Sequence, residues 1–241
     1  MCRFLETIRV EAGRALHLEY HQARVSATAA AHGVPALELA DTVAELLQVD
    51  IFAGGGAAPA SARTPGGAAT LGDRGRQKLR IVYELRTGGP SVLQHELLPY
   101  HIRLIRTLVC VEAPGLRYDF KYADRSELDR LLRENPNAPG PPARETEPPA
   151  GETEPLLLRN GYLSDSRYAN LVLREAGGRL LTPAQPLLAG TARARLLAAG
   201  VLHTAPLHIS DLPHFQSVCL INAMLDIGDC ELPVSAVQQP R

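Results

Sequence analysis

Two stretches of low complexity limit what this 241-residue chain can fold into. Residues 53–76, AGGGAAPASARTPGGAATLGDRGR, consist mainly of glycine, alanine and proline, and residues 135–155, NPNAPGPPARETEPPAGETEP, are rich in proline and glutamate. Neither stretch has a helical or strand period, and neither has the apolar content to offset the entropy lost when a backbone is ordered. We therefore predict a mobile insertion at 53–76 and a disordered insertion at 135–155, both outside the packed domains.

The segments on either side of the first insertion predict a small N-terminal α+β domain, residues 1–102. FLETIRV alternates in polarity and reaches an acidic-Gly turn, which is typical of a hairpin. The next segment is rich in helix formers and ends at His32-Gly33, a pair typical of a helix C-terminus. The expected elements are a hairpin over 4–10 and 15–20, helices over 21–34 and 36–49, and paired strands over 78–85 and 91–98.

The remainder of the chain predicts a larger domain, residues 103–241, with mainly antiparallel sheets. Its helices are expected where apolar residues recur at helical spacing, and its strands where apolar runs are bounded by turn residues. The expected elements are strands over 107–113, 156–159, 162–175 after an Asn160-Gly161 turn, 177–183 and 217–225, and helices over 126–135 and 187–201. The chain is therefore expected to be an α+β protein of two domains.

Composition excludes several classes of function. Hydrophobic residues make up 45% and charged residues 21% of the chain, and a formal net charge of −1 gives no electrostatic case for binding nucleic acid or a membrane. No apolar run approaches the roughly 20 residues that cross a bilayer, and the N-terminus lacks the apolar core of a signal peptide. Cysteines and histidines are dispersed without metal-ligand spacing. We expect a cytoplasmic protein that acts on a small molecule, with no metal centre.

Lys121 is unusual in this composition, because only two of the 25 lysine and arginine residues are lysines. Arginine serves equally well as an exposed cation, but its guanidinium does not lose its proton. A lysine amine can be desolvated, deprotonate and attack a carbonyl to form a Schiff base. Lys121 is therefore a candidate nucleophile; the alternative is that Lys121 and Lys78 are ordinary surface cations.

A lysine Schiff base is typical above all of pyridoxal phosphate, which also needs a phosphate site and a carboxylate facing its ring nitrogen. Gly190 and Thr191 stand where a helix begins, so backbone N–H groups and the helix dipole favour an anion there; taken alone, the pair is more typical of a plain helix start. Arg24 is a second candidate phosphate ligand. Asp165 follows a tight Asn-Gly turn and is the candidate acid, although it also fits a local turn.

The order of these motifs resembles one family of pyridoxal-phosphate enzymes, class IV. FLETIRV with HQAR is followed by K-x-x-D-R, NG-x-L-S-D-S-x-x-A-N-L, TP with LL-x-G-T-x-R, and LINAM. The family holds aminodeoxychorismate lyases, D-amino-acid transaminases and branched-chain transaminases. The resemblance covers most of the chain apart from the two insertions. It implies the two-domain fold type IV, pyridoxal 5'-phosphate as the cofactor, and a homodimer.

The resemblance also implies a role for each matching residue. Lys121 falls on the Schiff-base lysine, and Arg24, three residues after His21, falls on the arginine that binds the phosphate. Asp165 falls on the acid that faces the pyridine nitrogen. Most relatives carry glutamate there, but aspartate can still keep the nitrogen protonated. The other matches are the phosphate loop Gly190, Thr191, Ala192 and Arg193, then Asn170 five residues after the acid, and Asn222 and Ala223 near the substrate carboxylate.

Two departures from the family pattern concern the substrate rather than the cofactor. The chain begins almost directly at FLET, without the GDG-like segment that many relatives place before it, and YELRTGGP stands where many have RG-x-G-x-RG. From the short start and the LINAM loop we expect a lyase resembling aminodeoxychorismate lyase, acting on a small amino substrate. A D-amino-acid or branched-chain transaminase is the alternative. A non-catalytic cofactor-binding homologue is an alternative of another class.

Overall fold

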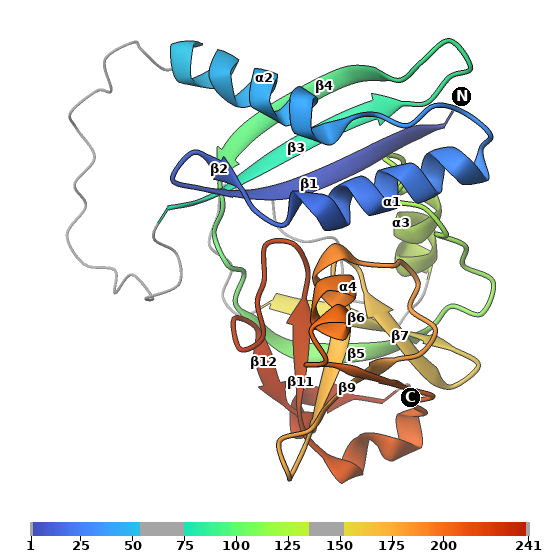
Figure 1. The fold of residues 1–241 in the computed structure, drawn as a ribbon. Coiled ribbons are helices and arrows are strands. Elements are labelled where there is room, and N and C mark those ends of the chain that lie inside the picture. The colour runs from blue at the N-terminus through green and yellow to red at the C-terminus, as the bar shows by residue number, and fades with distance from the viewer. Residues whose placement is uncertain (1, 54–74, 135–151, 240–241) are drawn as a thin grey trace. The chain divides into compact units, whose positions relative to one another are not determined.

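The computed structural model describes residues 2–53, 75–134 and 152–239, so most of the two predicted insertions lies outside the described residues (Figure 1). By its internal contacts the chain divides into two compact units, Met1–His101 and Ile102–Arg241. Each unit contains a sheet with helices, as expected of an α+β protein, and this fold class is confirmed.

The N-terminal unit is a four-stranded antiparallel sheet in the order β2-β1-β3-β4, with two helices over one face (Figure 1). The strong alternation of β1 explains this arrangement, because Phe4, Ile8 and Val10 all point to the same side and are buried. The elements are β1 Arg3–Glu11, β2 Arg14–Ala15, α1 Leu18–Ala31, α2 Leu39–Ala53, β3 Arg76–Glu84 and β4 Ser91–Pro99.

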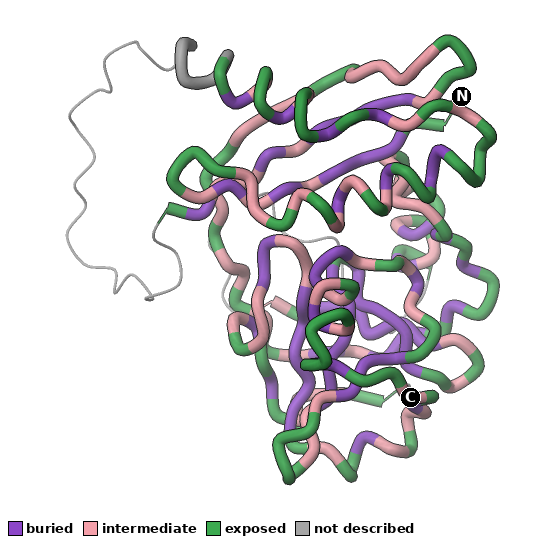
Figure 2. The backbone as a smooth tube through the Cα atoms, in the orientation of Figure 1, coloured by how far each residue is buried: buried purple, intermediate pink, exposed green. Residues whose placement is uncertain are grey.

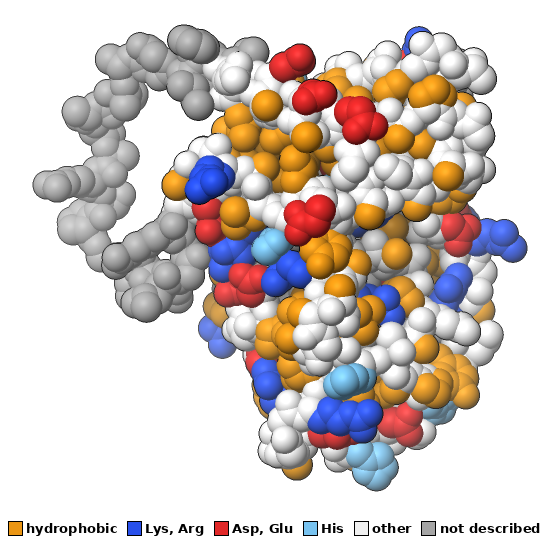
Figure 3. Space-filling view, viewed as in Figure 1, with side chains coloured by type: hydrophobic (Ala, Val, Ile, Leu, Met, Phe, Trp, Pro, Cys, Tyr) orange, Lys and Arg blue, Asp and Glu red, His pale blue; other side chains and the backbone are white. Residues whose placement is uncertain are grey.

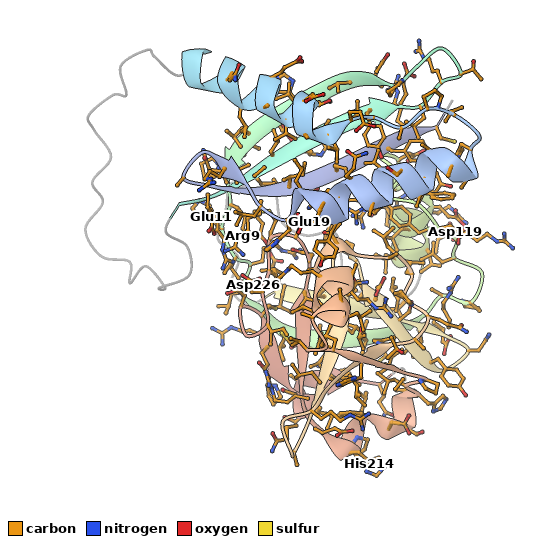
Figure 4. The ribbon with its side chains drawn as sticks, in the orientation of Figure 1. Arg9, Glu11, Glu19, Asp119, His214 and Asp226 are labelled. Carbon is orange, nitrogen blue, oxygen red and sulfur yellow. The ribbon has the colours of Figure 1, made fainter. Side chains whose placement is uncertain are left out.

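The other side of β1 carries polar pairs. Arg9 and Glu11 lie two residues apart and point toward one another, with Arg9 Nε 2.7 Å from Glu11 Oε1 (Figure 4). Buried positions gather in the strands of this sheet and on the inner sides of its helices (Figure 2). The second face of β1 is thus partly polar and only partly exposed, with Leu5 also buried on it.

The predicted second hairpin strand, residues 15–20, is wrong beyond Ala15. His17 takes a left-handed conformation, with φ of +56°, and the chain turns there, so that α1 begins at Leu18. Residues 15–20 fit both the period of a strand and the period of a helix, and the packing of the longer helix α1 decides between them.

The C-terminal unit contains a nine-stranded mixed sheet among its described residues. Most of its strand pairs are antiparallel, while β5 pairs in parallel with β6 and with β13, and β9 with β10. The elements are β5 Ile105–Glu112, α3 Ser126–Glu134, β6 Glu152–Arg159, β7 Tyr162–Ser166, β8 Asn170–Glu175, β9 Leu180–Pro183, α4 Thr191–Ala198, β10 His203–Ala205, a 3-10 helix Ile209–His214, β11 Phe215–Ile221, β12 Glu231–Pro233, a 3-10 turn Val234–Ala236 and β13 Val237–Gln238.

Both predicted insertions are too long at their C-terminal ends. Residues 152–155, assigned to the disordered insertion, open β6 and pair with β5, with Thr107 opposite Thr153 and Val109 opposite Pro155. Arg76, assigned to the mobile insertion, starts β3 opposite Glu11. In both places pairing with a neighbouring strand overrides local composition.

Charged side chains of both signs are spread over the face of the molecule shown in Figure 3, with hydrophobic side chains between them. Within the described residues, no helix combines the length and the apolar content that crossing a membrane requires.

Candidate cofactor site

The candidate acid and its neighbouring asparagine face each other across two strands. Asp165 on β7 pairs in register with Asn170 on β8, and both side chains are buried. Asn170 Nδ2 donates to Asp165 Oδ1 at 2.8 Å and to the carbonyl of Leu188 at 2.9 Å, and the Leu188 N–H donates to Asp165 Oδ2 at 2.9 Å. The carboxylate is therefore held in a fixed orientation from both of its oxygens.

Burial raises the pKa of Asp165 to about 6, and the donors from Asn170 and Leu188 and the positive charge of Arg193 only partly oppose this. The donors that hydrogen-bond Asp165 are neutral amides. A buried carboxylate whose partners are neutral gains most from a cation that approaches it.

Gly190 has a specific reason to be glycine. A Cβ built on Gly190 lies 1.9 Å from Asn170 Oδ1, which is closer than any non-bonded contact allows. The residue that orients Asp165 therefore also contacts the residue that precedes α4. Any side chain at position 190 displaces Asn170 or the start of the helix.

The N-terminus of α4 follows directly. Gly190 is its N-cap in an extended conformation, no side chain among the described residues caps the helix start, and Thr191 and Ala192 are buried. Arg193 in the first turn donates from Nη2 to the carbonyl of Pro183 at 2.9 Å. Helix N–H groups that have no partner within the helix, together with the positive end of the helix dipole, suit a phosphate or another anion.

Lys121 is half-buried in the loop between β5 and α3, which Asp119 marks in Figure 4. The loop is closed on itself, because the hydroxyl of Tyr118 donates to the carbonyl of Tyr122 at 2.7 Å. Its aromatic side chains join one apolar cluster with α3 and with the loop before α4. The buried members of this cluster are Val111, Ala113, Leu116, Tyr118, Leu128, Leu132, Leu157 and Leu187, with Tyr122, Leu131 and Leu188 at its edge.

Asn222 and Ala223 lie in a tight turn after β11. The backbone N–H and C=O of Asn222 pair with those of Leu225, and Asn222 Oδ1 accepts from the Met224 N–H at 2.8 Å. Asn222 Nδ2 donates to the carbonyl of Tyr168 at 3.2 Å, in the turn between β7 and β8. The β7–β8 turn lies between Asp165 and Asn170. The predicted substrate loop, which carries Asn222, therefore contacts the segment next to the predicted acid.

Arg24 lies in the other unit and has partners of its own. Its Nε donates to Glu6 Oε1 at 2.9 Å and its Nη2 to Glu6 Oε2 at 2.6 Å, while His21 Nδ1 lies 2.6 Å from the same Oε2. Glu6 is completely buried. Burial acts to raise the pKa of Glu6, but the nearby Arg24 and His21 outweigh it and hold that pKa at about 2.

Sequence reasoning missed Glu6. The signal was present, since Glu6 occupies an inward position of β1 between the buried Phe4 and Ile8. An acid on an apolar strand face needs a partner, and the cations on α1 provide it.

The structure thus brings Asp165, Asn170, Gly190 and the start of α4 into one cluster within the C-terminal unit. The loops that carry Lys121 and Asn222 contact the same part of that unit. Arg24 belongs to the N-terminal unit, so its part in a common site stays a prediction.

Part of the chain is similar to known proteins. Residues 149–232 match the family model described as amino-transferase class IV. A protein of Haemophilus influenzae described only as uncharacterized is 28% identical over 147 residues, which are 61% of this chain and 68% of its own length.

Two solved structures share the fold. A candidate 4-amino-4-deoxychorismate lyase from Haemophilus somnus, 24% identical, superposes with a TM-score of 0.67 over 93% of this chain and 97% of its own. A hypothetical aminotransferase from Mycobacterium tuberculosis in its PLP-bound form, 20% identical, gives a TM-score of 0.66 over 100% of this chain and 84% of its own. The match to the class IV amino-transferase family model thus covers residues 149–232, and the fold of the chain is that of these solved structures.

Proposed function

We propose that this protein is a pyridoxal-phosphate-dependent lyase, similar to aminodeoxychorismate lyase, that acts on a small amino substrate through Lys121. The observation that carries the proposal is the environment of Asp165. This carboxylate is buried with a raised pKa among neutral donors, beside a helix start that suits an anion. This cofactor needs a carboxylate that faces its ring nitrogen and an anion site for its phosphate. Asp165 and the start of α4 are the candidates for these two roles.

The residues of this chain fit the cofactor in chemical type. Asp165 provides the acceptor for a protonated ring nitrogen, and a positive charge there lowers its pKa from about 6 and removes much of the cost of its burial. The N–H groups of Thr191 and Ala192, and the hydroxyl of Thr191, suit the phosphate. Arg24 is proposed as a further phosphate ligand, with Glu6 and His21 holding its guanidinium in place.

Bound pyridoxal phosphate supplies an aldehyde and an electron-withdrawing ring, which acidify the substrate carbon next to the amino group. Lys121 would hold the cofactor through its amine and would act as the base near the substrate carbon next to the amino group. Asp165 would hold the proton on the ring nitrogen. Asn170 and Leu188 hold the carboxylate in one orientation, so no reorganisation is needed during the reaction.

Lyase and transaminase reactions use the same residues, so the site residues do not distinguish them and the choice depends on the similar proteins. The similar structure from Haemophilus somnus is described as a candidate lyase, whereas the one from Mycobacterium tuberculosis is described as an aminotransferase. A D-amino-acid or branched-chain transaminase is therefore the second candidate. A non-catalytic homologue that only holds the cofactor would not need the buried acid, because a protonated ring nitrogen serves the reaction rather than the binding. We also propose a homodimer, as the family resemblance implies.

Turnover assays separate these candidates. A lyase splits aminodeoxychorismate without an added keto acid as acceptor, because both products come from the one substrate. A transaminase needs an acceptor, so it consumes D- or L-amino acids only when 2-oxoglutarate is added. We expect turnover of aminodeoxychorismate alone. Turnover that depends on 2-oxoglutarate would favour the transaminase, and a cofactor-loaded protein inactive in both assays would support the non-catalytic homologue.

A further inference from the structure

Arg125 ends the K-x-x-D-R motif and has no role in the mechanism above. Its guanidinium carbon lies 4.2 Å from the ring centroid of Tyr168 and 5.9 Å from that of Tyr118. Its Nη2 also donates to the carbonyl of Arg167. One side chain from the Lys121 loop thus contacts two consecutive residues of the β7–β8 turn.

The loop side of this contact is anchored. Tyr118 is buried in the apolar cluster of α3 and bonds across the loop to Tyr122. Asp124 Oδ1 accepts from the Ser126 N–H at 2.9 Å, which starts α3 immediately after Arg125. Arg125 therefore lies between two ordered parts of the loop, the Tyr118–Tyr122 bond that encloses Lys121 and the start of α3.

The turn side is equally compact. The Ser166 N–H donates to the carbonyl of Ala169 at 2.8 Å, and Ser166 Oγ accepts from the Ala169 N–H at 3.1 Å. The turn connects Asp165 directly to Asn170. Arg125 and Asn222 bind its two successive carbonyls, those of Arg167 and Tyr168.

From these contacts we infer that Arg125 is a positioning residue, which fixes the Lys121 loop against the β7–β8 turn that follows Asp165. The inference rests on the proposed function. A lysine and an acid that act on opposite parts of one cofactor must keep a constant separation. Arg125 joins the two segments through a charge-assisted hydrogen bond and a cation–π contact.

Arginine suits this task better than lysine. Its planar guanidinium can lie against an aromatic ring and donate a hydrogen bond in its own plane at the same time. An ammonium makes one of these contacts at a time. Arg125→Lys should therefore have an intermediate effect, and Arg125→Gln the full effect.

Hydrogen–deuterium exchange of the cofactor-free protein tests the inference without any catalysis. In Arg125→Gln we expect exchange to become about tenfold faster both in peptides covering 118–125 and in those covering 165–170, because two contacts are lost together. Arg125→Lys should give about a threefold increase in the same peptides. Arg130→Gln is the matched control. Arg130 lies on the exposed side of α3 and pairs with Glu134 at 2.8 Å, so its loss should change exchange in neither segment.

A second readout uses the cofactor. Arg125→Gln should link pyridoxal phosphate to Lys121 about tenfold more slowly than Arg130→Gln, and should lower kcat more than it raises KM. Unchanged exchange over 165–170 in Arg125→Gln, or unchanged linking, overturns the inference. If even the unsubstituted protein links no cofactor, the proposed function fails, and the exchange measurement still decides whether Arg125 holds the two segments together.

Discussion

Glu6 and Asp165 are both buried carboxylates, yet their environments shift their pKa values in opposite directions. Glu6 accepts hydrogen bonds from Arg24 and contacts His21, and its pKa falls to about 2. Asp165 accepts from two neutral amides, and its pKa rises to about 6. Both carboxylates make hydrogen bonds, so the difference lies in the charge of the donors.

The contrast indicates which carboxylate has its charge compensated by neighbouring cations. The charge of Glu6 is already compensated within the N-terminal unit, where it orients Arg24. The charge of Asp165 is compensated only in part, by Arg193, which makes Asp165 the better place for a cationic ring to bind. A buried acid with only neutral partners thus carries more functional information than one within an ion pair.

Asp165→Asn should have the largest effect on function. The amide has nearly the same shape but cannot hold a proton on a ring nitrogen, so we expect kcat to fall by about 100- to 1,000-fold, roughly 3 to 4 kcal/mol. Cofactor affinity should fall by less than about tenfold, since the phosphate contacts remain. An equal loss of affinity and turnover would mark Asp165 as structural.

Glu6→Gln should instead affect stability. Removing the carboxylate leaves the Arg24 guanidinium without its buried partner, which typically costs about 3 kcal/mol. Urea unfolding at pH 7 measures this loss. Glu134→Gln is the control, because Glu134 pairs with Arg130 on the exposed side of α3 and its change should stay within about 0.5 kcal/mol. Equal stability of the two variants would remove the contrast between the carboxylates.

The two carboxylates should respond to pH with opposite signs. The folded pKa of Glu6, about 2, lies below its ordinary 4.5, so its contribution is present above about pH 4.5 and is lost as the pH falls toward 2. The folded pKa of Asp165, about 6, lies above its ordinary 3.8, so cofactor-free protein loses stability as the pH rises from about 4 to 6. Each effect amounts to about 3 kcal/mol.

Unfolding free energies of the cofactor-free wild type and of the two variants, measured between pH 3 and 7, separate these contributions. Relative to Asp165→Asn, the wild type should become less stable as the pH rises through this range. Relative to Glu6→Gln, it should become more stable. Parallel curves for all three proteins would contradict both pKa shifts.

Gly190→Ala should give the smallest of these effects. The added Cβ overlaps Asn170 Oδ1 at 1.9 Å, so it disturbs the orientation of Asp165 and the start of α4 together. We expect stability to fall by about 1 to 3 kcal/mol and cofactor affinity to weaken about tenfold. Gly177→Ala is the matched control, because nothing lies within 4 Å of its added Cβ. Identical cofactor affinity in the two variants would show that the contact at Gly190 has no part in binding.

Patterns within single segments predicted much of this molecule. The α+β class, the β1 alternation and the Gly190 start of α4 could be recognised because each depends on neighbouring residues. The short strands β10, β12 and β13 were missed, since two or three residues show no period. Residues 152–155 were missed because they pair with a strand more than forty residues away.

The candidate site shows the same division. Lys121, Asp165 and Gly190 stood out through residue type and motif order. Glu6 and Arg125 did not, because their roles depend on contacts with distant residues. Glu6 meets α1 only after the helix packs on β1, and Arg125 meets Tyr168 only when β7 and β8 form their turn. Pairing across a fold has no local signal in one sequence.

Borohydride trapping tests the central claim most directly. The purified protein is incubated with pyridoxal phosphate, reduced with borohydride, digested and mapped by mass spectrometry, because reduction makes a lysine-bound cofactor permanent. We predict a yellow protein and one modified site, Lys121, with modification lost in Lys121→Arg. Attachment at Lys78 instead, or no attachment at all, would contradict the account.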